Sequence, residues 1–169
     1  MLRRLAIVPL AAFLLSATPV KDSPARTMLN TLAGLEGNWE GDLVWTGARQ
    51  GTGKIAASYH VAKFKGTVFE DLIIDGKPYM TSVYHLDGSD LRVTHFCVES
   101  QPRLKADRFD PATGSAHFGL VDVTNAGPKS GYVEEISLAR PGPEQLTIEF
   151  VFKGNAPRSV EAITLKRVA

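Results

Sequence analysis

The strongest candidates for chemistry in this chain are a histidine and the only cysteine, His95 and Cys97, which stand two residues apart. Segment 90–98 has the composition of a β-strand, and side chains two residues apart on a strand share a face. Val93, His95 and Cys97 therefore share one face. Arg92, which favours solvent, lies on the other. We expect the His95 face to point inward, so that an imidazole and a thiol are neighbours inside the protein.

This pair allows two non-catalytic interpretations. The simpler one is a hydrogen-bonded core histidine beside a small buried thiol. The other is the polar lining of a cavity for a small molecule. Gln101 and Arg103 share a face further along the chain and would extend that lining. Because a buried guanidinium is costly without a partner, Arg103 in a cavity would be a clamp for a ligand carboxylate.

A metal or haem site is a third interpretation of His95 and Cys97. Two ligands on one strand can reach the same ion, but protein sites usually need three or four. His85 and His60 are the obvious residues to complete such a set, and His85 is also a candidate at the cavity edge. The sequence alone assigns no metal and no cofactor.

Catalysis by Cys97 is the weakest interpretation. Neighbours on the same face of a strand lie about 7 Å apart, which is long for activation of the thiol by His95. The sequence contains no Ser-His-Asp order, paired-carboxylate motif, phosphate-binding loop or Cys-x-x-Cys. We therefore expect a binding protein and not an enzyme.

The elements that would position these residues are almost all strands. One short helix is expected over 26–35, where apolar residues recur at helical spacing. Turn residues such as Asp75-Gly76 and Asp87-Gly88 then separate short runs typical of strands. The ten predicted strands are 38–46, 53–63, 66–75, 78–87, 90–98, 102–110, 114–122, 131–140, 143–153 and 157–167.

Short turns between all these strands predict consecutive hairpins. A flat sheet of about ten strands is disfavoured, because strand twist makes it curl or close, and closure also removes its exposed edges. The predicted fold is therefore all-β: a single antiparallel up-and-down β-barrel with the N-terminal helix closing one end. A two-sheet sandwich is the alternative architecture. A barrel of this size can hold one small ligand.

The N-terminus has the pattern of a secretory signal peptide. Arg3 and Arg4 precede an almost wholly apolar run over 5–17, which is too short to span a bilayer as a helix. Cleavage would follow Ala25 or occur earlier, near Ala17. We expect residues 1–25 to be the signal peptide, residues 26–169 to be the barrel domain, and the mature protein to be periplasmic or secreted without a stable membrane anchor.

Composition narrows the class of partner. The 169 residues carry a formal net charge of +1, with acidic and basic residues interspersed. No basic stripe indicates a nucleic-acid partner. A single cysteine allows no disulfide within the chain, which is ordinary for an exported bacterial protein.

Several runs of residues together resemble a family of uncharacterised bacterial lipocalin-like proteins of the calycin superfamily. These runs are Gly37-Asn38-Trp39-Glu40-Gly41, Tyr84-His85-Leu86-Asp87-Gly88, the segment 91–97, Gln101-Pro102-Arg103, and the segment 152–167. The resemblance spans roughly 32–167. It implies a calycin barrel in which Trp39 packs across the barrel floor against an arginine of the last strand, here Arg167, with a cation–π contact of roughly 1 kcal/mol.

Three positions depart from the family pattern. Phe96 stands where tyrosine is usual, Ser100 stands where asparagine is usual, and Gly131-Tyr132-Val133 stands where a pair of histidines is expected. The resemblance implies no established activity. The leading expectation is a barrel that binds a small apolar or amphipathic ligand. The alternatives are a metal- or haem-binding barrel that uses His95 and Cys97, and a non-enzymatic interaction protein that uses an exposed apolar patch on the barrel's outside.

Overall fold

The structure is a computed structural model that describes residues 22–63, 66–97, 99–110 and 112–168. Most of the expected signal peptide, residues 1–21, lies outside the described residues. One helix, α1 (Pro24–Ala33), precedes ten strands. The strands are β1 (Gly37–Gly47), β2 (Gly51–Val61), β3 (Thr67–Ile74), β4 (Lys77–Asp87), β5 (Asp90–Cys97), β6 (Gln101–Asp110), β7 (Ser115–Thr124), β8 (Val133–Gly142), β9 (Gln145–Phe152) and β10 (Ser159–Val168).

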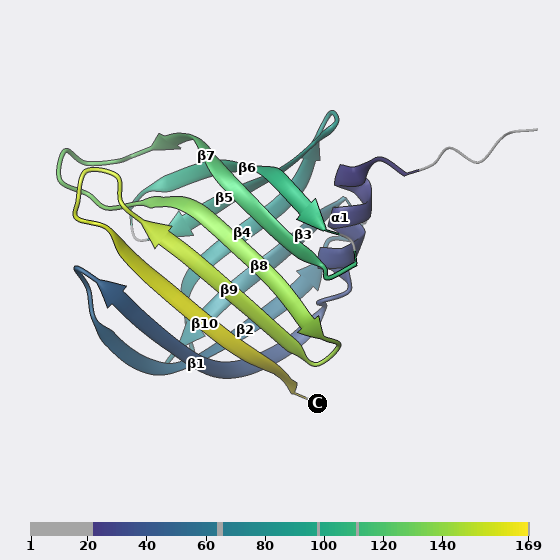
Figure 1. Ribbon diagram of the computed structural model, residues 1–169, viewed down its shortest axis with the longest axis horizontal. Helices are drawn as coiled ribbons and strands as arrows, with labels where there is room; N and C mark the ends of the chain where they lie inside the picture. The colour runs from purple at the N-terminus through teal and green to yellow at the C-terminus, as the bar shows by residue number, and fades with distance from the viewer. Residues whose placement is uncertain (1–21, 64–65, 98, 111, 169) are drawn as a thin grey trace, which may run out of the picture.

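The strands form a closed antiparallel barrel in which each strand pairs with its neighbours in sequence and β10 pairs with β1 (Figure 1). The predicted up-and-down barrel is confirmed, and the sandwich alternative is wrong. The Asp-Gly turns act as expected. Asp75 and Gly76 have φ of 51° and 72°, as a tight two-residue hairpin turn requires. Because each hairpin directs its strand onto the preceding one, the sheet curls until its two edges meet.

Helix α1 covers one end of the barrel (Figure 1), as predicted. It packs Met28, Leu29 and Leu32 against the barrel and contacts β2 to β6. The helix begins two residues earlier than predicted, because Ser23 caps it and Pro24 occupies its first turn. The same end is closed by Trp39, whose indole donates to the Leu35 carbonyl over 2.9 Å.

The expected contact between the first and last strands is present. The Arg167 guanidinium lies 4.3 Å from the centroid of the Trp39 ring. It also donates to the carbonyls of Glu36 and Gly34, over 2.7 and 3.0 Å. Arg167 therefore joins β10, β1 and the end of α1.

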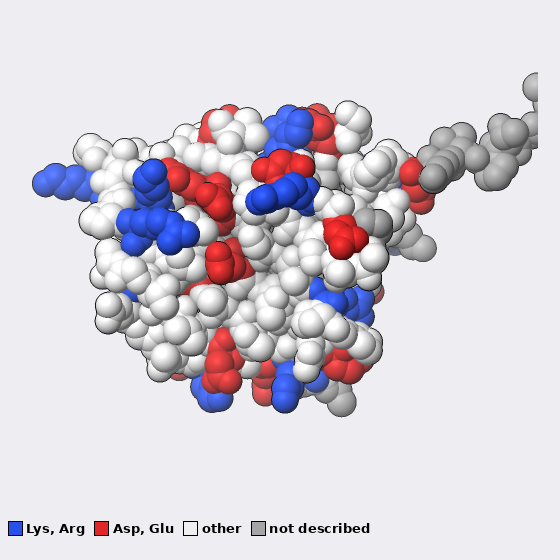
Figure 2. Space-filling view, in the orientation of Figure 1, with Lys and Arg blue, Asp and Glu red and all other residues white. Residues whose placement is uncertain are grey.

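Side chains alternate between a buried interior and a charged exterior along most strands. Figure 2 shows acidic and basic side chains interspersed over the visible face of the barrel, without a large area of one sign. The interior is the core of the protein. The end opposite α1, which we call the mouth, is formed by the end of β1 and the start of β2, and by the corresponding ends of the other strands.

Candidate functional site

A row of polar side chains runs around the inside of the barrel across four neighbouring strands. Tyr59 of β2 pairs in register with Glu70 of β3, Glu70 with Ser82 of β4, and Ser82 with His95 of β5. All four residues are fully or almost fully buried. The antiparallel register therefore places four inward polar groups side by side.

Glu70 is the hub of this row. Its carboxylate accepts hydrogen bonds from Tyr59 and Tyr84, each over 2.8 Å, and from Ser82 over 3.3 Å. Burial raises the pKa of Glu70, while the three donors oppose that rise because they stabilise the charged form. Burial, together with the Glu70 charge, also raises the pKa of both tyrosines, so both remain donors.

His95 ends the row. Its Nδ1 lies 2.9 Å from the Ser82 hydroxyl, whereas its buried Nε2 has no hydrogen-bond partner in the structure. Burial lowers the pKa of His95 to about 3, so the ring is neutral at physiological pH. The ring of Phe150, on β9, lies 5.0 Å away, centroid to centroid. At this level the barrel is filled by side chains, and Nε2 of His95 is fully buried among them.

A second carboxylate, Glu161, lies inside the barrel nearer the mouth. It belongs to the inward face of β10, pairs in register with Trp45 and Phe150, and is 0% exposed. Neither of its two oxygens has a hydrogen-bond partner. Burial raises the pKa of Glu161 to about 7, although the charge of Arg49 opposes the shift.

The rim of the mouth is crossed by Arg49, which stands in the turn between β1 and β2. Its guanidinium lies 3.9 Å from the centroid of the Trp45 ring and donates to the Tyr79 hydroxyl over 3.3 Å. Tyr79 is available there because the ladder between β3 and β4 shifts register, leaving Tyr79 as an extra residue between two paired ones. A β-bulge of this kind re-aims a side chain.

Cys97 stands on the opposite side of the barrel from Glu161, because β5 and β10 are five strands apart in the ring of ten. The thiol is half-buried. Burial and the Glu161 charge raise its pKa to about 11. The thiol is therefore protonated at neutral pH and is a poor nucleophile.

We use the name mouth site for a set of residues that lie between His95 and the rim of the barrel. They come from the barrel wall and the rim: Trp45, Arg49, Tyr79, Cys97, Phe152 and Glu161. Trp45 and Phe152 pack together with ring centroids 5.0 Å apart. The mouth site thus combines an apolar wall, an enclosed carboxylate and a cation at its rim.

The structure divides the predicted site residues into two groups. Val93 and His95 are buried on the inward face, and Cys97 follows them toward the mouth. Gln101 and Arg103 do not face the interior of the barrel. Cys97 and Ser100 are bridge partners in a tight turn, and partners across a hairpin share a face. Inward positions therefore continue from Ser100 to the even-numbered residues of β6.

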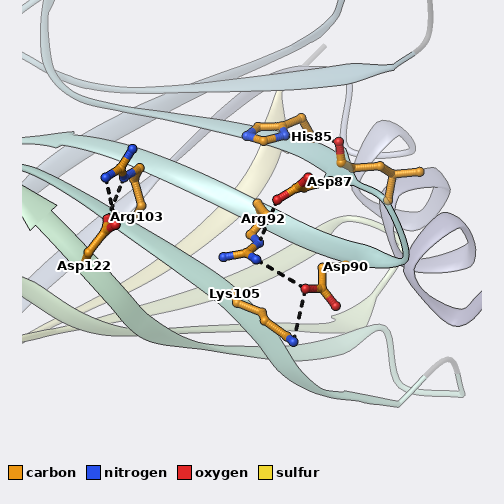
Figure 3. Close-up of polar contacts among 8 residues, drawn as sticks. His85, Asp87, Asp90, Arg92, Arg103, Lys105 and Asp122 are labelled. Atoms are coloured by element: carbon orange, nitrogen blue, oxygen red, sulfur yellow. Dashed lines mark hydrogen bonds and ion pairs between the residues drawn. The ribbon is translucent and has the colours of Figure 1, made fainter.

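The outer face of the barrel holds the remaining candidates. Arg103 is 52% exposed, and its Nε and Nη2 lie 2.5 and 2.7 Å from the carboxylate oxygens of Asp122 (Figure 3). The prediction that Arg103 binds a ligand carboxylate inside the barrel is therefore wrong. Gln101 accepts hydrogen bonds from Thr124 and Asn125 at the edge of β7.

His85 does not face the interior of the barrel either. Its ring lies on the outer side of β4, in the row that pairs with Arg92, and its Nδ1 lies 3.3 Å from the Leu86 carbonyl (Figure 3). His60 is exposed and stacks on Phe69. Neither histidine can join His95 at one ion. Among the described residues, no group of three metal-ligating side chains comes together.

Sequence reasoning missed Glu70 and Glu161. Glu161 was detectable, since it shares the alternation of Ile163 and Leu165, whereas Thr164 and Lys166 lie outside. Glu70 was harder to detect because Asp71 follows it, which puts an acidic residue on each face of β3.

Surface hollows lie apart from His95. One of about 910 Å³ lies between the start of α1, the start of β5 and the end of β6, and is lined by residues such as Met28, Leu91 and Phe109. One of about 330 Å³ lies on the hairpin of β1 and β2 and includes Trp45. Within the described part of the chain, no helix is long and apolar enough to cross a membrane.

Comparison with known proteins establishes the fold alone. Rv2717c from M. tuberculosis superposes with a TM-score of 0.55 and 16% identity, covering 87% of this chain and 99% of its own. A protein of unknown function from the DUF3598 family of Nostoc punctiforme gives a TM-score of 0.55 at 12% identity, covering 81% of this chain and 49% of its own. No family model and no curated protein matches the sequence.

Proposed function

We propose that this protein is an exported, lipocalin-like binding protein that holds a small amphipathic ligand at the mouth site. The observation that carries the proposal is the pair of unpartnered polar groups enclosed by the barrel, Nε2 of His95 and the carboxylate of Glu161. A buried polar group without a hydrogen bond costs roughly 1–3 kcal/mol, so groups of this kind mark places where a ligand or ordered water completes the structure.

The walls of the mouth site fit the apolar part of such a ligand. Trp45 and Phe152 form a packed aromatic pair beside Glu161. Pockets for small molecules combine apolar walls with a few polar groups that fix orientation. At the rim, Arg49 is held to Tyr79 by one exposed hydrogen bond.

Binding without catalysis is the interpretation we favour. The raised pKa of Cys97 and the lowered pKa of His95 leave one group protonated and the other neutral, and no hydrogen bond joins them. Neither group is tuned as a nucleophile or as a general base near pH 7. An interaction role has little support, since the exposed large apolar side chains of the described residues, Val44, Phe96 and Val121, stand on strands that do not pair with one another.

The proposal is tested with the neutral fluorescent probe N-phenyl-1-naphthylamine and with native mass spectrometry of protein purified from the periplasm. We expect saturable, single-site binding of the probe and a co-purifying mass that is lost on denaturation. Cys97→Trp should fill the mouth site and abolish binding. Phe96→Trp, the matched change on the outer face, should leave it intact.

Equal binding by the Cys97→Trp variant and the parent protein would place the ligand elsewhere and refute the proposal. A Soret band in the purified protein would instead favour the haem alternative. Recovery of the protein only from the cytoplasm would contradict the exported location.

A further inference from the structure

The two carboxylates enclosed by the barrel are in opposite states. Glu70 accepts three hydrogen bonds from Tyr59, Tyr84 and Ser82. Glu161 is equally buried but accepts none. An ionised carboxylate is purely an acceptor, so only a donor can satisfy it. The barrel therefore supplies donors to the first carboxylate and leaves the second without one.

No neighbouring group supplies the missing donor to Glu161. Arg49 is the nearest cation, but its guanidinium is engaged with the Trp45 ring and the Tyr79 hydroxyl. Cys97 and Tyr79 also face Glu161 closely enough for their charges to interact, and neither donates to it. His95, on β5, is neutral. These are the titratable groups that the rim, β4 and β5 present to Glu161.

The surroundings of Glu161 also favour a positive ligand group. A carboxylate next to an aromatic face attracts cations through charge and through the ring quadrupole. Arg49 already uses the face of Trp45 in this way. A ligand carboxylate at the same place would instead meet the like charge of Glu161 in a poorly solvated space, where repulsion is strong.

We propose that the mouth site selects amphipathic molecules with a protonated amine head, which donates to Glu161 while the apolar part packs against Trp45 and Phe152. This inference rests on the proposed function and names the class of ligand. Burial holds the pKa of Glu161 near 7, so binding of the amine should strengthen as Glu161 ionises between about pH 6 and pH 8.

Three probes that share an eight-carbon chain and differ only in the head group test this assignment: octylamine, octanol and octanoate. Each is titrated calorimetrically into the full-length mature protein at about pH 8, where both the amine and Glu161 are charged. We expect octylamine to bind at least about tenfold more tightly than octanol, and octanoate to bind most weakly.

Glu161→Gln should remove the advantage of octylamine over octanol, because the amide no longer pairs with the ammonium charge. Glu149→Gln is the matched control. Glu149 lies on the exposed face of β9, next to Phe150, the register partner of Glu161. This control should keep the full preference for the amine.

The outcomes distinguish the two proposals. Equal binding of octylamine and octanol, or a preference for octylamine that survives in Glu161→Gln, overturns the amine assignment and leaves the binding function standing. Preferential binding of octanoate does the same. If none of the three probes binds while N-phenyl-1-naphthylamine does, the amine assignment fails alone. If the naphthylamine probe also fails to bind, the binding function fails with it.

Discussion

The hydroxyl oxygen of Ser82 lies 2.9 Å from Nδ1 of His95, and the single proton of that hydroxyl decides which tautomer the histidine adopts. When Glu70 is ionised, Ser82 donates to it over 3.3 Å. Nδ1 of His95 must then carry the proton and donate to Ser82. This leaves Nε2 of His95 as a lone-pair acceptor within the barrel.

Replacing Glu70 by glutamine should therefore reverse the tautomer of His95. The new amide oxygen can accept from Tyr59 and Tyr84, and the amide nitrogen would donate to Ser82. Ser82 would then donate to Nδ1, and Nε2 would carry the proton. Long-range nitrogen–proton NMR correlations distinguish the two tautomers. The same tautomer in both proteins at neutral pH would show that Glu70 does not control His95.

Glu161→Gln should stabilise the ligand-free protein, and more so as the pH rises. The pKa of Glu161 in the folded protein, about 7, is above its usual value. The stability that Glu161 contributes is therefore fully present below about pH 4.5 and is lost as the pH rises through 7. The amide has no such loss. We expect the free energy of unfolding to rise by about 1–3 kcal/mol at pH 8, and by much less at pH 5.

Urea unfolding at the two pH values measures this difference. Glu149→Gln should leave stability within about 0.5 kcal/mol of the parent protein, as is usual at exposed positions. A Glu161→Gln variant that is less stable than the parent at pH 8 would mean that its carboxylate has partners within the protein. A gain in stability together with the loss of amine binding would mark Glu161 as a group retained for function.

The Cys97 thiol should react slowly with an aromatic disulfide reagent at pH 8. Its pKa of about 11 leaves little thiolate at that pH. Glu161→Gln should speed the reaction, because the Glu161 charge is one cause of the raised pKa. Octylamine should slow it by covering the thiol. The rate is followed by absorbance across pH 7–10. An unchanged rate in Glu161→Gln would show that the charge of Glu161 does not influence the Cys97 thiol.

Arg167→Ala should be destabilising by about 2 kcal/mol. The change removes the cation–π contact with Trp39 and the hydrogen bonds to Glu36 and Gly34. Arg167→Lys should retain part of the stability that Arg167 contributes, since lysine keeps the charge but lacks the planar guanidinium. Arg108→Ala is the control, because Arg108 is largely exposed. Equal effects of the two alanine changes in urea unfolding would refute the closure role of Arg167.

If the expected signal peptide is cleaved, the mature protein should begin before Ser23. The Ser23 hydroxyl accepts from the Arg26 amide over 3.2 Å and caps α1. Cleavage after Ala25 would remove this cap and the first two residues of the helix, whereas cleavage near Ala17 keeps them. The intact mass of periplasmic protein decides between the sites. A chain that starts at Arg26 would contradict the prediction.

The barrel and the inward position of His95 could be read from local rules. Alternation over segment 90–98 determines which residues share a face, and the exposed preference of Arg92 identifies the inward one. Asp-Gly turns determine where the hairpins begin. These signals act between residues close in the chain, so the sequence alone was enough to place His95 and Cys97 inside.

The site itself required the tertiary structure. Tyr59, Glu70, Ser82 and His95 belong to four strands, and only the register of three hairpins brings them into one row. The register of the turn at Cys97 and Ser100 likewise puts Arg103 outside. Within segment 90–98, sequence determined which side chains turn inward, because the strand period is local. Closure of the barrel decided that Glu161 would face Cys97 across the interior without a partner, because the separation of β5 and β10 depends on all ten strands together.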